Sequence, residues 1–439
     1  MINTPNEIVK QYNNSQNFKS LMGSRGLFEQ TKMNARFYAG DQWYGTAYNS
    51  SRPLVRNNII KRIGEYKMGV LAGGNTEICF AANEKGNLPE FLNEHFKFWS
   101  KSKHFEEKTA NVLKDSFISG TGVLYTFWQS EENGEADINC EVLDILNVAF
   151  GDVTLDDVQK QPYIIVKNYR ETESLKNTAI YFGANKDTVN NIKSDYLAGK
   201  TAVYTKFYKE KDKNGCVKVK AVVVTENAVI REPFDTNLTL YPICIFAWEK
   251  EKNNIFGQSE ITNILPNQIA INRLITAQVW ASMSMGMPIM TVNGDIITGE
   301  ISNDPGQIIK VYGAGEDVKD AIQFVTPPDF SENFNQAINA LVSNTLENAG
   351  GAGALYGSVA YNNTAAINAL VKNNDISMKV LKLRYLDFLS EFGFIWLDFC
   401  TAYYGNKTFY NKAGEKFLFS KQNCKNTKFS VEVKQNDSE

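Results

Sequence analysis

The sequence predicts an α+β fold organised around one unusually uncharged helix, and two observations lead to this prediction. Apolar residues recur at helical spacing before residue 120 and again after residue 330, whereas residues 202–248 are rich in strand patterns. Between Glu260 and Asp295 the only charged residue is Arg273. Because a surface helix needs a charged face toward water, we expect protein to cover this helix on nearly all sides.

Composition indicates a globular chain. It has 439 residues, 43% of them apolar, which is enough to bury a core and to form two or three domains. Six cysteines occur without a C-x-x-C pair, and the first residues carry no apolar leader. We therefore expect reduced thiols in a cytosolic environment.

The net charge of −3 hides an uneven distribution. Residues 1–64 contain nine Lys and Arg against three Asp and Glu, whereas residues 257–330 contain three against eight. Because a DNA-binding groove gains affinity by neutralising phosphates, the acidic middle argues against ordinary DNA binding. It would suit a surface past which DNA slides without being gripped. The alternative is that these charges only form solvated faces without a partner.

The N-terminal half predicts helices followed by strands. The first 35 residues are typical of one or two short helices, and residues 88–116 show helical spacing that ends before Gly120-Thr121-Gly122. The pair Asn214-Gly215 predicts a hairpin turn between two of the strands. Strands are expected at 123–128, 203–208, 217–224 and 243–247.

The uncharged helix is expected at 264–286, a length of about 34 Å at 1.5 Å per residue. Its stretch 274–290 has 17 residues without a charge but contains Gln278, Ser282 and Ser284. This segment is too short and too polar for a good membrane span.

Beyond this helix we expect a small β-containing module at 288–326 and then a returning helix, because Asp329 and Glu332 stand at capping-box spacing. Residues 350–363 contain four glycines and no charge, which is typical of a loop. A helical pattern at 364–404 would be about 60 Å long if unbroken, with a weak point at Asn373-Asn374-Asp375. The basic tail ends in an expected strand at 429–433.

Several motifs occur in an order that resembles tailed-bacteriophage portal proteins. The resemblance covers roughly residues 37–404 and rests on the order of the motifs rather than on any single one. They are Gly40-Asp41-Gln42-Trp43, Gly120-Thr121-Gly122 before a strand, Phe150-Gly151-Asp152, and Gly257-Gln258-Ser259-Glu260 before the uncharged helix with Pro266-Asn267-Gln268.

This resemblance implies a portal-like architecture in which two antiparallel stem helices are joined by a clip. The implied segments are a mixed helix and sheet wing at 1–256, a first stem helix at 257–287, a clip at 288–327, a second stem helix at 328–349, a tunnel loop at 350–363, a long wing helix at 364–404, and a C-terminal strand with a short crown at 405–439.

The resemblance also assigns candidate site residues. Packing between subunits in the stem is expected from Ile271, Leu274, Gln278, Ala281, Ser282 and Met285. Contact with the terminase or an adaptor is expected in the clip from Asn293, Asp295, Glu300 and Asp304. Lining of the DNA channel is expected in the tunnel loop from Gly350, Gly351, Gly353, Leu355, Tyr356 and Gly357.

By the same resemblance the chain would form a homo-oligomer, expected to be a dodecamer, at one capsid vertex. Double-stranded DNA would pass through it without sequence specificity during packaging and ejection. Its protein partners would be the terminase large subunit, a head-completion or adaptor protein, and the major capsid or scaffolding protein, with no membrane. It would be found in the virion, and in the host cytoplasm during assembly.

No catalytic constellation stands out. We expect His95 and His104 to be surface residues of one polar helix, and too few ligands converge on them for a metal site. Gly199-Lys200-Thr201 lacks the glycine and the buried strand that a phosphate loop needs before it. We expect neither a cofactor nor enzyme activity. Two alternatives remain: another virion assembly protein, such as a different connector or a membrane-associated scaffold, and a nucleotide-handling enzyme.

Overall fold

The structure is a computed structural model that describes residues 4–436 with gaps. The residues outside the description are 1–3, 24, 47–52, 74, 83–86, 131–135, 195–198, 212–214, 286–288, 293–321, 326–331, 351–363, 406, 411–413, 420–428 and 437–439. Within the described part, helices and strands are mixed as the α+β prediction requires.

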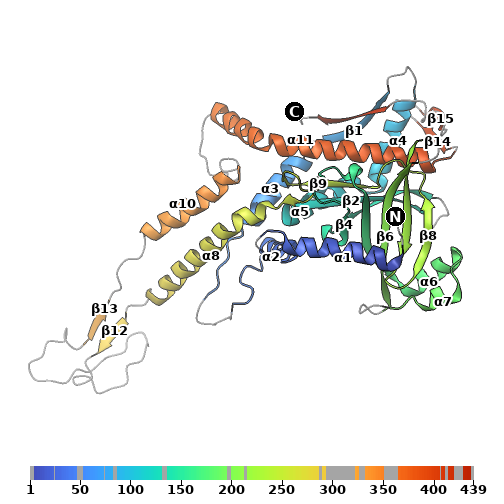
Figure 1. Cartoon of the computed structure of the whole chain (residues 1–439). Coiled ribbons are helices and arrows are strands. Elements are labelled where there is room, and N and C mark those ends of the chain that lie inside the picture. The colour runs from blue at the N-terminus through green and yellow to red at the C-terminus, as the bar shows by residue number, and fades with distance from the viewer. Residues whose placement is uncertain are drawn as a thin grey trace, which may run out of the picture.

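Two parts are visible in Figure 1: a body of helices and sheets, and an arm that projects from it. The arm consists of α8 (Glu260–Met285), α10 (Glu332–Asn348) and the paired strands β12 (Ile289–Val292) and β13 (Ile322–Val325). The expected β-containing module therefore has a strand near each of its ends. The returning helix begins at Glu332, and the predicted capping residue Asp329 lies outside the described residues.

Three helices begin the body: α1 (Pro5–Leu21), α2 (Leu27–Ala39) and α3 (Ile59–Ala72). α1 is fixed to the body by Lys19, whose ammonium donates hydrogen bonds to the carbonyls of Ile145 (2.7 Å) and Val148 (2.6 Å). Burial lowers the pKa of Lys19 to about 7. The ring of Tyr12 also packs edge-on against Tyr204 at 5.2 Å.

The helix predicted at 88–116 is in fact two helices, α4 (Leu88–Ser102) and α5 (Phe105–Ser119). His104 separates them in the left-handed conformation, with φ at 52°. Because the chain turns there, Trp99 and Phe105 come to lie 5.7 Å apart in one aromatic cluster instead of on successive turns of one helix.

The expectation that both histidines lie on the surface is correct for His104 and wrong for His95. The ring of His95 stacks on Phe409 at 4.2 Å, and its Nε2 lies 3.2 Å from the hydroxyl of Tyr404. Burial lowers the pKa of His95 to about 4. The sequence pattern missed this because Phe409 belongs to a strand more than 300 residues away.

Two antiparallel sheets form the centre of the body. One has the order β4 (Val148–Phe150), β5 (Tyr163–Glu171), β6 (Lys200–Lys211), β7 (Val217–Val224) and β8 (Val229–Asp235). The other has the order β3 (Ala136–Leu143), β2 (Thr121–Ser130) and β9 (Ile243–Ala247). The four predicted strands therefore exist, but the last of them joins the first in a separate sheet.

The predicted hairpin pairs β6 with β7, and Lys211 faces Val217 at its end. Gly215 adopts φ of 78°, and Asn214 lies outside the described residues. Between β5 and β6 the chain forms α6 (Thr172–Tyr181) and the short α7 (Lys186–Asn190).

The long helix α11 (Thr364–Tyr403) runs without a break through the predicted weak point. It fills the core with Phe392, Trp396 and Phe399, each 2% exposed or less. After it come β14 (Lys407–Tyr410), β15 (Lys416–Phe419) and β16 (Phe429–Asn436).

The strand expected within residues 405–439 is β16, which joins the body. β16 pairs along its whole length with β1 (Asn75–Ala82), which the sequence did not predict. The pair packs on α11 so closely that a Cβ on Gly393 would lie 2.7 Å from Val431. The C-terminal strand is part of the body because its partner strand near the N-terminus has nothing else to pair with among the described strands.

Replacing His95 with Phe should make the chain less sensitive to acid. In the unfolded chain this histidine binds a proton near pH 6.5, whereas the half-buried His95 of the folded chain stays neutral down to about pH 4. The free energy of unfolding therefore falls as the pH drops through this window, by on the order of 2–3 kcal/mol from this group. Urea denaturation at pH 7 and 4.5 should show a smaller loss for His95→Phe than for the parent.

His104→Asn is the control for removing a histidine. His104 is exposed and has a positive φ, and asparagine tolerates that conformation. An equal loss of stability in the parent and in His95→Phe would contradict the lowered pKa of His95.

Candidate functional site

The arm is the candidate functional site, and its two helices run antiparallel. Asn267 of α8 donates a hydrogen bond to Thr345 of α10 at 3.2 Å, and Gln278 donates one to Asn335. Between these two bonds the residue number rises by 11 along α8 and falls by 10 along α10, as it must in an antiparallel pair. Figure 1 shows the pair extending away from the body to β12 and β13.

The start of α8 is fixed by close backbone packing between two of the sequence motifs. A Cβ on Gly120 would lie 2.1 Å from the carbonyl oxygen of Gly257, and a Cβ on Gly257 would lie 2.5 Å from that of Gly120. The backbone N–H of Gly257 donates to the hydroxyl of Thr121 at 2.8 Å, and Ser259 donates to the carbonyl of Phe117 at 2.6 Å. Only glycine permits this approach, so Gly-Thr-Gly and Gly-Gln-Ser-Glu form one junction.

Further along α8, two buried amides bind the segment that follows Gly-Asp-Gln-Trp. Gln268 has no exposed surface; its Oε1 accepts from the N–H groups of Ile59 (3.0 Å) and Ile60 (3.3 Å), and its Nε2 donates to the carbonyl of Asn57 at 2.6 Å. The Oδ1 of Asn272 accepts from the N–H of Asn57 at 3.0 Å. These amides supply acceptors that the first turn of α3 lacks.

We call the hydrogen bonds of Gln268 and Asn272 the amide ladder, and it extends to the Gly-Asp-Gln-Trp motif. The Nδ2 of Asn272 donates to the side-chain oxygen of Gln42 at 2.5 Å, and Thr276 accepts from the N–H of Val55 at 3.1 Å. Trp43 donates from its indole to the carbonyl of Val55 at 3.1 Å. Gly-Asp-Gln-Trp thus contacts α8 itself, whereas Gly-Thr-Gly contacts the Gly-Gln-Ser-Glu segment that leads into it.

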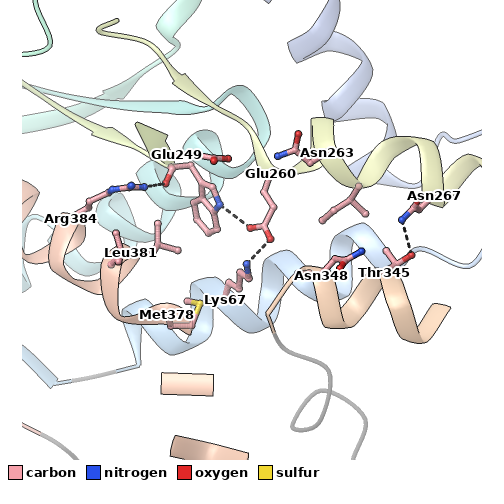
Figure 2. Close-up of a pocket in the computed structure, with 14 residues that line it drawn as sticks. Lys67, Glu249, Glu260, Asn263, Asn267, Thr345, Asn348, Met378, Leu381 and Arg384 are labelled. Atoms are coloured by element: carbon pink, nitrogen blue, oxygen red, sulfur yellow. Dashed lines mark hydrogen bonds and ion pairs between the residues drawn. The ribbon is translucent and has the colours of Figure 1, made fainter. Parts of the chain in front are cut away.

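Figure 2 shows a cavity of about 440 Å³ at the root of the arm, where α3, α8, α10 and α11 meet. Lys67 and Glu260 form an ion pair there at 2.5 Å, with only 12% and 13% of their side-chain surfaces exposed. The indole of Trp248 donates to the second carboxylate oxygen at 2.8 Å, and Arg384 donates to the backbone carbonyl of Trp248 at 2.8 Å. Because both oxygens of Glu260 are engaged, this carboxylate anchors the helix start.

The predicted stem residues divide into two groups. Ile271 has no exposed surface and packs inside its own chain, so we remove it from the set expected to contact a neighbouring subunit. Leu274, Gln278 and Ala281 are half-buried and Ser282 is exposed, whereas the side chain of Met285 lies outside the described residues.

The outer half of α8 exposes large apolar side chains. Trp280 is 41% exposed and Met283 is 62% exposed, although the inner residues Ile261 and Ile264 are buried. Arg273 is the one charged residue from 261 to 294, so this segment has no charged face to present to water. Contiguous exposed apolar surface is often found where a protein contacts another molecule.

The other predicted sites lie mostly beyond the description. Of the tunnel-loop residues only Gly350 is described; its N–H donates to the carbonyl of Glu347 at 2.8 Å and its φ is 74°. This positive φ ends α10 as a glycine typically ends a helix. The remaining loop residues and all four clip residues are outside the described residues: Gly351, Gly353, Leu355, Tyr356, Gly357, Asn293, Asp295, Glu300 and Asp304.

Other chemistry has little support in the described residues. Lys200 and Thr201 lie in strand β6, and Thr201 bonds to Thr172 at 2.8 Å, so Gly-Lys-Thr does not form a loop before a helix. Among the described residues, no group of three His, Cys, Asp or Glu could hold a metal ion. In the same part of the chain, no helix has the length and apolar character needed to cross a bilayer.

No protein-family model matches the chain, and a search of curated proteins gave no significant match. Functional inference therefore depends on the motifs and on the geometry of the arm.

Gln268→Leu should destabilise the protein by roughly 3 kcal/mol, because at similar side-chain volume it removes three hydrogen bonds that the buried amide makes to the backbone of Asn57, Ile59 and Ile60. Chemical denaturation would measure the loss. The control is Asn263→Leu, an exposed amide on the same helix, which should change stability by less than about 0.5 kcal/mol. Similar losses in both variants would show that the amide ladder does not hold α8.

Proposed function

We propose that this chain is a portal protein of a tailed bacteriophage, forming a ring of about twelve subunits at one capsid vertex. In this proposal α8 and α10 are the stem, the segment containing β12 and β13 is the clip, and the body with α11 is the wing. The observation on which the proposal depends is the arm, whose inner half is fixed in the body and whose outer half exposes uncharged surface.

A ring explains why such a helix can be stable in water. In a closed ring each subunit contacts one neighbour with one face and the other neighbour with a different face. The half-buried Leu274 and Ala281 and the exposed Trp280 and Met283 would then be covered by the arms of neighbouring subunits. The core of such interfaces is depleted of charge and enriched in Trp and Met, as the outer half of α8 is.

The convergence of the motifs supports the same proposal. Gly-Asp-Gln-Trp, Gly-Thr-Gly and Gly-Gln-Ser-Glu resemble portal motifs by their order, and all three contact the root of α8 or the helix itself. Residues that fix one helix end this strongly are expected where the helix must keep a constant angle to the body. A symmetric ring requires such a constant angle, because an error repeats in every subunit.

The charge distribution fits a channel for DNA. Residues 257–330 contain eight acids against three bases, and a negative wall repels phosphates so that the duplex does not stall. In this proposal the terminase large subunit supplies ATP hydrolysis and this chain has no enzyme activity. The clip would meet the terminase and later the head-completion protein, and the wing would meet capsid or scaffolding protein.

Ala281→Glu tests the ring. It would place an unpaired carboxylate between neighbouring stem helices and cost several kcal/mol per subunit. We expect the parent to form rings of about twelve subunits without detergent, and the variant to remain smaller, as measured by native mass spectrometry and negative-stain imaging. Asn227→Glu, which adds the same charge at an exposed turn of the body, is the control. Normal rings from Ala281→Glu would refute the enclosed stem, and a parent without rings would refute the portal proposal.

Leu355→Arg tests whether the glycine-rich loop faces DNA. In a ring it would add on the order of twelve cations around the duplex, each a phosphate contact. Rings should assemble normally, yet packaging of DNA by the terminase should slow, most strongly at low salt. Leu355→Gln controls for the loss of the leucine. Unchanged packaging by the Arg variant at low salt would remove the loop from the channel wall.

A further inference from the structure

Another exposed apolar surface among the described residues lies on α6, between β5 and β6. The inner face of α6 has its own small core over the five-stranded sheet, made by Leu175, Ala179, Ile192, Val203, Ala228 and Ile230. This core fixes α6 in place. Figure 1 shows α6 and α7 at the opposite end of the molecule from β12 and β13.

Three consecutive large apolar residues lie exposed where α6 ends. Ile180 is 58% exposed, Tyr181 is 83% exposed and Phe182 is 42% exposed. Single exposed apolar residues are ordinary, but a contiguous group is typical of a docking surface. We call Ile180, Tyr181 and Phe182 the α6 patch.

The α6 patch is held in position by its neighbours. The rings of Tyr181 and Phe182 meet edge-on at 5.1 Å. The guanidinium of Arg231 lies over the ring of Phe182 at 4.3 Å and over that of Phe234 at 3.3 Å. Aromatic rings that are already ordered lose little entropy when a partner binds.

A groove leads from the patch along α6. It has a volume of about 660 Å³ and is lined by Glu171, Glu173, Ser174, Asn177, Thr178, Tyr181 and Phe182. Its lining includes two carboxylates and no cation. Glu173 pairs with Lys176 at 2.8 Å, but 75% of the Glu173 side chain is exposed, so this pair contributes little and exchanges readily.

The spacing of these groups defines what the groove fits. Glu173 and Tyr181 lie eight residues apart on one helix face, which is about 12 Å at 1.5 Å per residue. We propose that the α6 patch and groove bind a protein segment that carries an apolar side chain and, about 12 Å away, a Lys or Arg. Nucleic acid is disfavoured because the two carboxylates repel phosphates.

A second copy of this chain is the less suitable occupant. The arm is the uncharged surface that neighbouring copies can cover, and α6 lies at the far end of the body from the tip of that arm. Copies that pack arm against arm therefore leave the α6 patch uncovered. The partner is expected to be a different protein.

Two helical peptides, used as probes, test the proposal on the purified full chain. One carries Phe and, eight residues later, Arg; the other has Glu in place of the Arg. Fluorescence anisotropy should show at least about fivefold tighter binding of the Arg peptide. Glu173→Lys should reverse this preference, and Tyr181→Ser should weaken both peptides by about tenfold. Tyr410→Ser and Glu432→Lys change exposed residues of the same kinds elsewhere and should leave binding unchanged.

Equal binding of the two peptides, or binding that Tyr181→Ser does not weaken, would overturn the proposal. A change in subunit number caused by Tyr181→Ser would also overturn it, because the patch would then lie between copies. Peptide binding does not depend on ring formation. Its failure is therefore distinguishable from failure of the portal proposal, which rests on subunit number.

Discussion

The amide ladder along α8 is the constraint on which the arm depends. Gln268 and Asn272 are buried, and between them they satisfy backbone groups of Asn57, Ile59 and Ile60 at the start of α3. A buried amide without partners would cost more than its hydrogen bonds contribute, so the two segments can only fold together. This coupling makes α8 part of the body for half of its length. The other half can then project as a rigid continuation rather than as a loose helix.

The glycine contact and the ion pair at the helix start complete this anchoring in different ways. Gly120 and Gly257 allow their backbones to approach so closely that a Cβ on either residue would clash with the other. Glu260 places its charge in the first turn of α8, where the helix dipole favours it, and Lys67 compensates its burial. Sterics thus set the position of the helix start, and electrostatics hold it. Both Lys67 and Glu260 line the cavity at the root of the arm, and their ion pair joins α3 to α8 there.

Much of the local structure was predictable because it is coded locally. The spacing of apolar residues predicted α8 and α11, and the Asn-Gly pair predicted the β6–β7 hairpin. What the sequence missed depends on distant partners. β1 pairs with a strand about 350 residues later, the half-buried ring of His95 stacks on Phe409, and Lys67 pairs with Glu260, which lies 193 residues later in the chain. The motifs of the candidate site were recognisable, but their contacts with α8 and with the segment leading into it were not, because hydrogen-bond partners leave no periodic signal.

The root of the arm and its outer half differ in how much of their surface the chain itself covers. At the root of the arm the polar groups of Gln268, Asn272 and Glu260 are bonded within the chain. At its outer half, and again at the α6 patch, apolar side chains stay exposed although the body has a large buried core to receive such residues. The core of the body therefore does not explain why these side chains are exposed. One such surface on the arm and another on the far side of the body would suit a subunit that contacts its own copies through the arm and a different protein through the body.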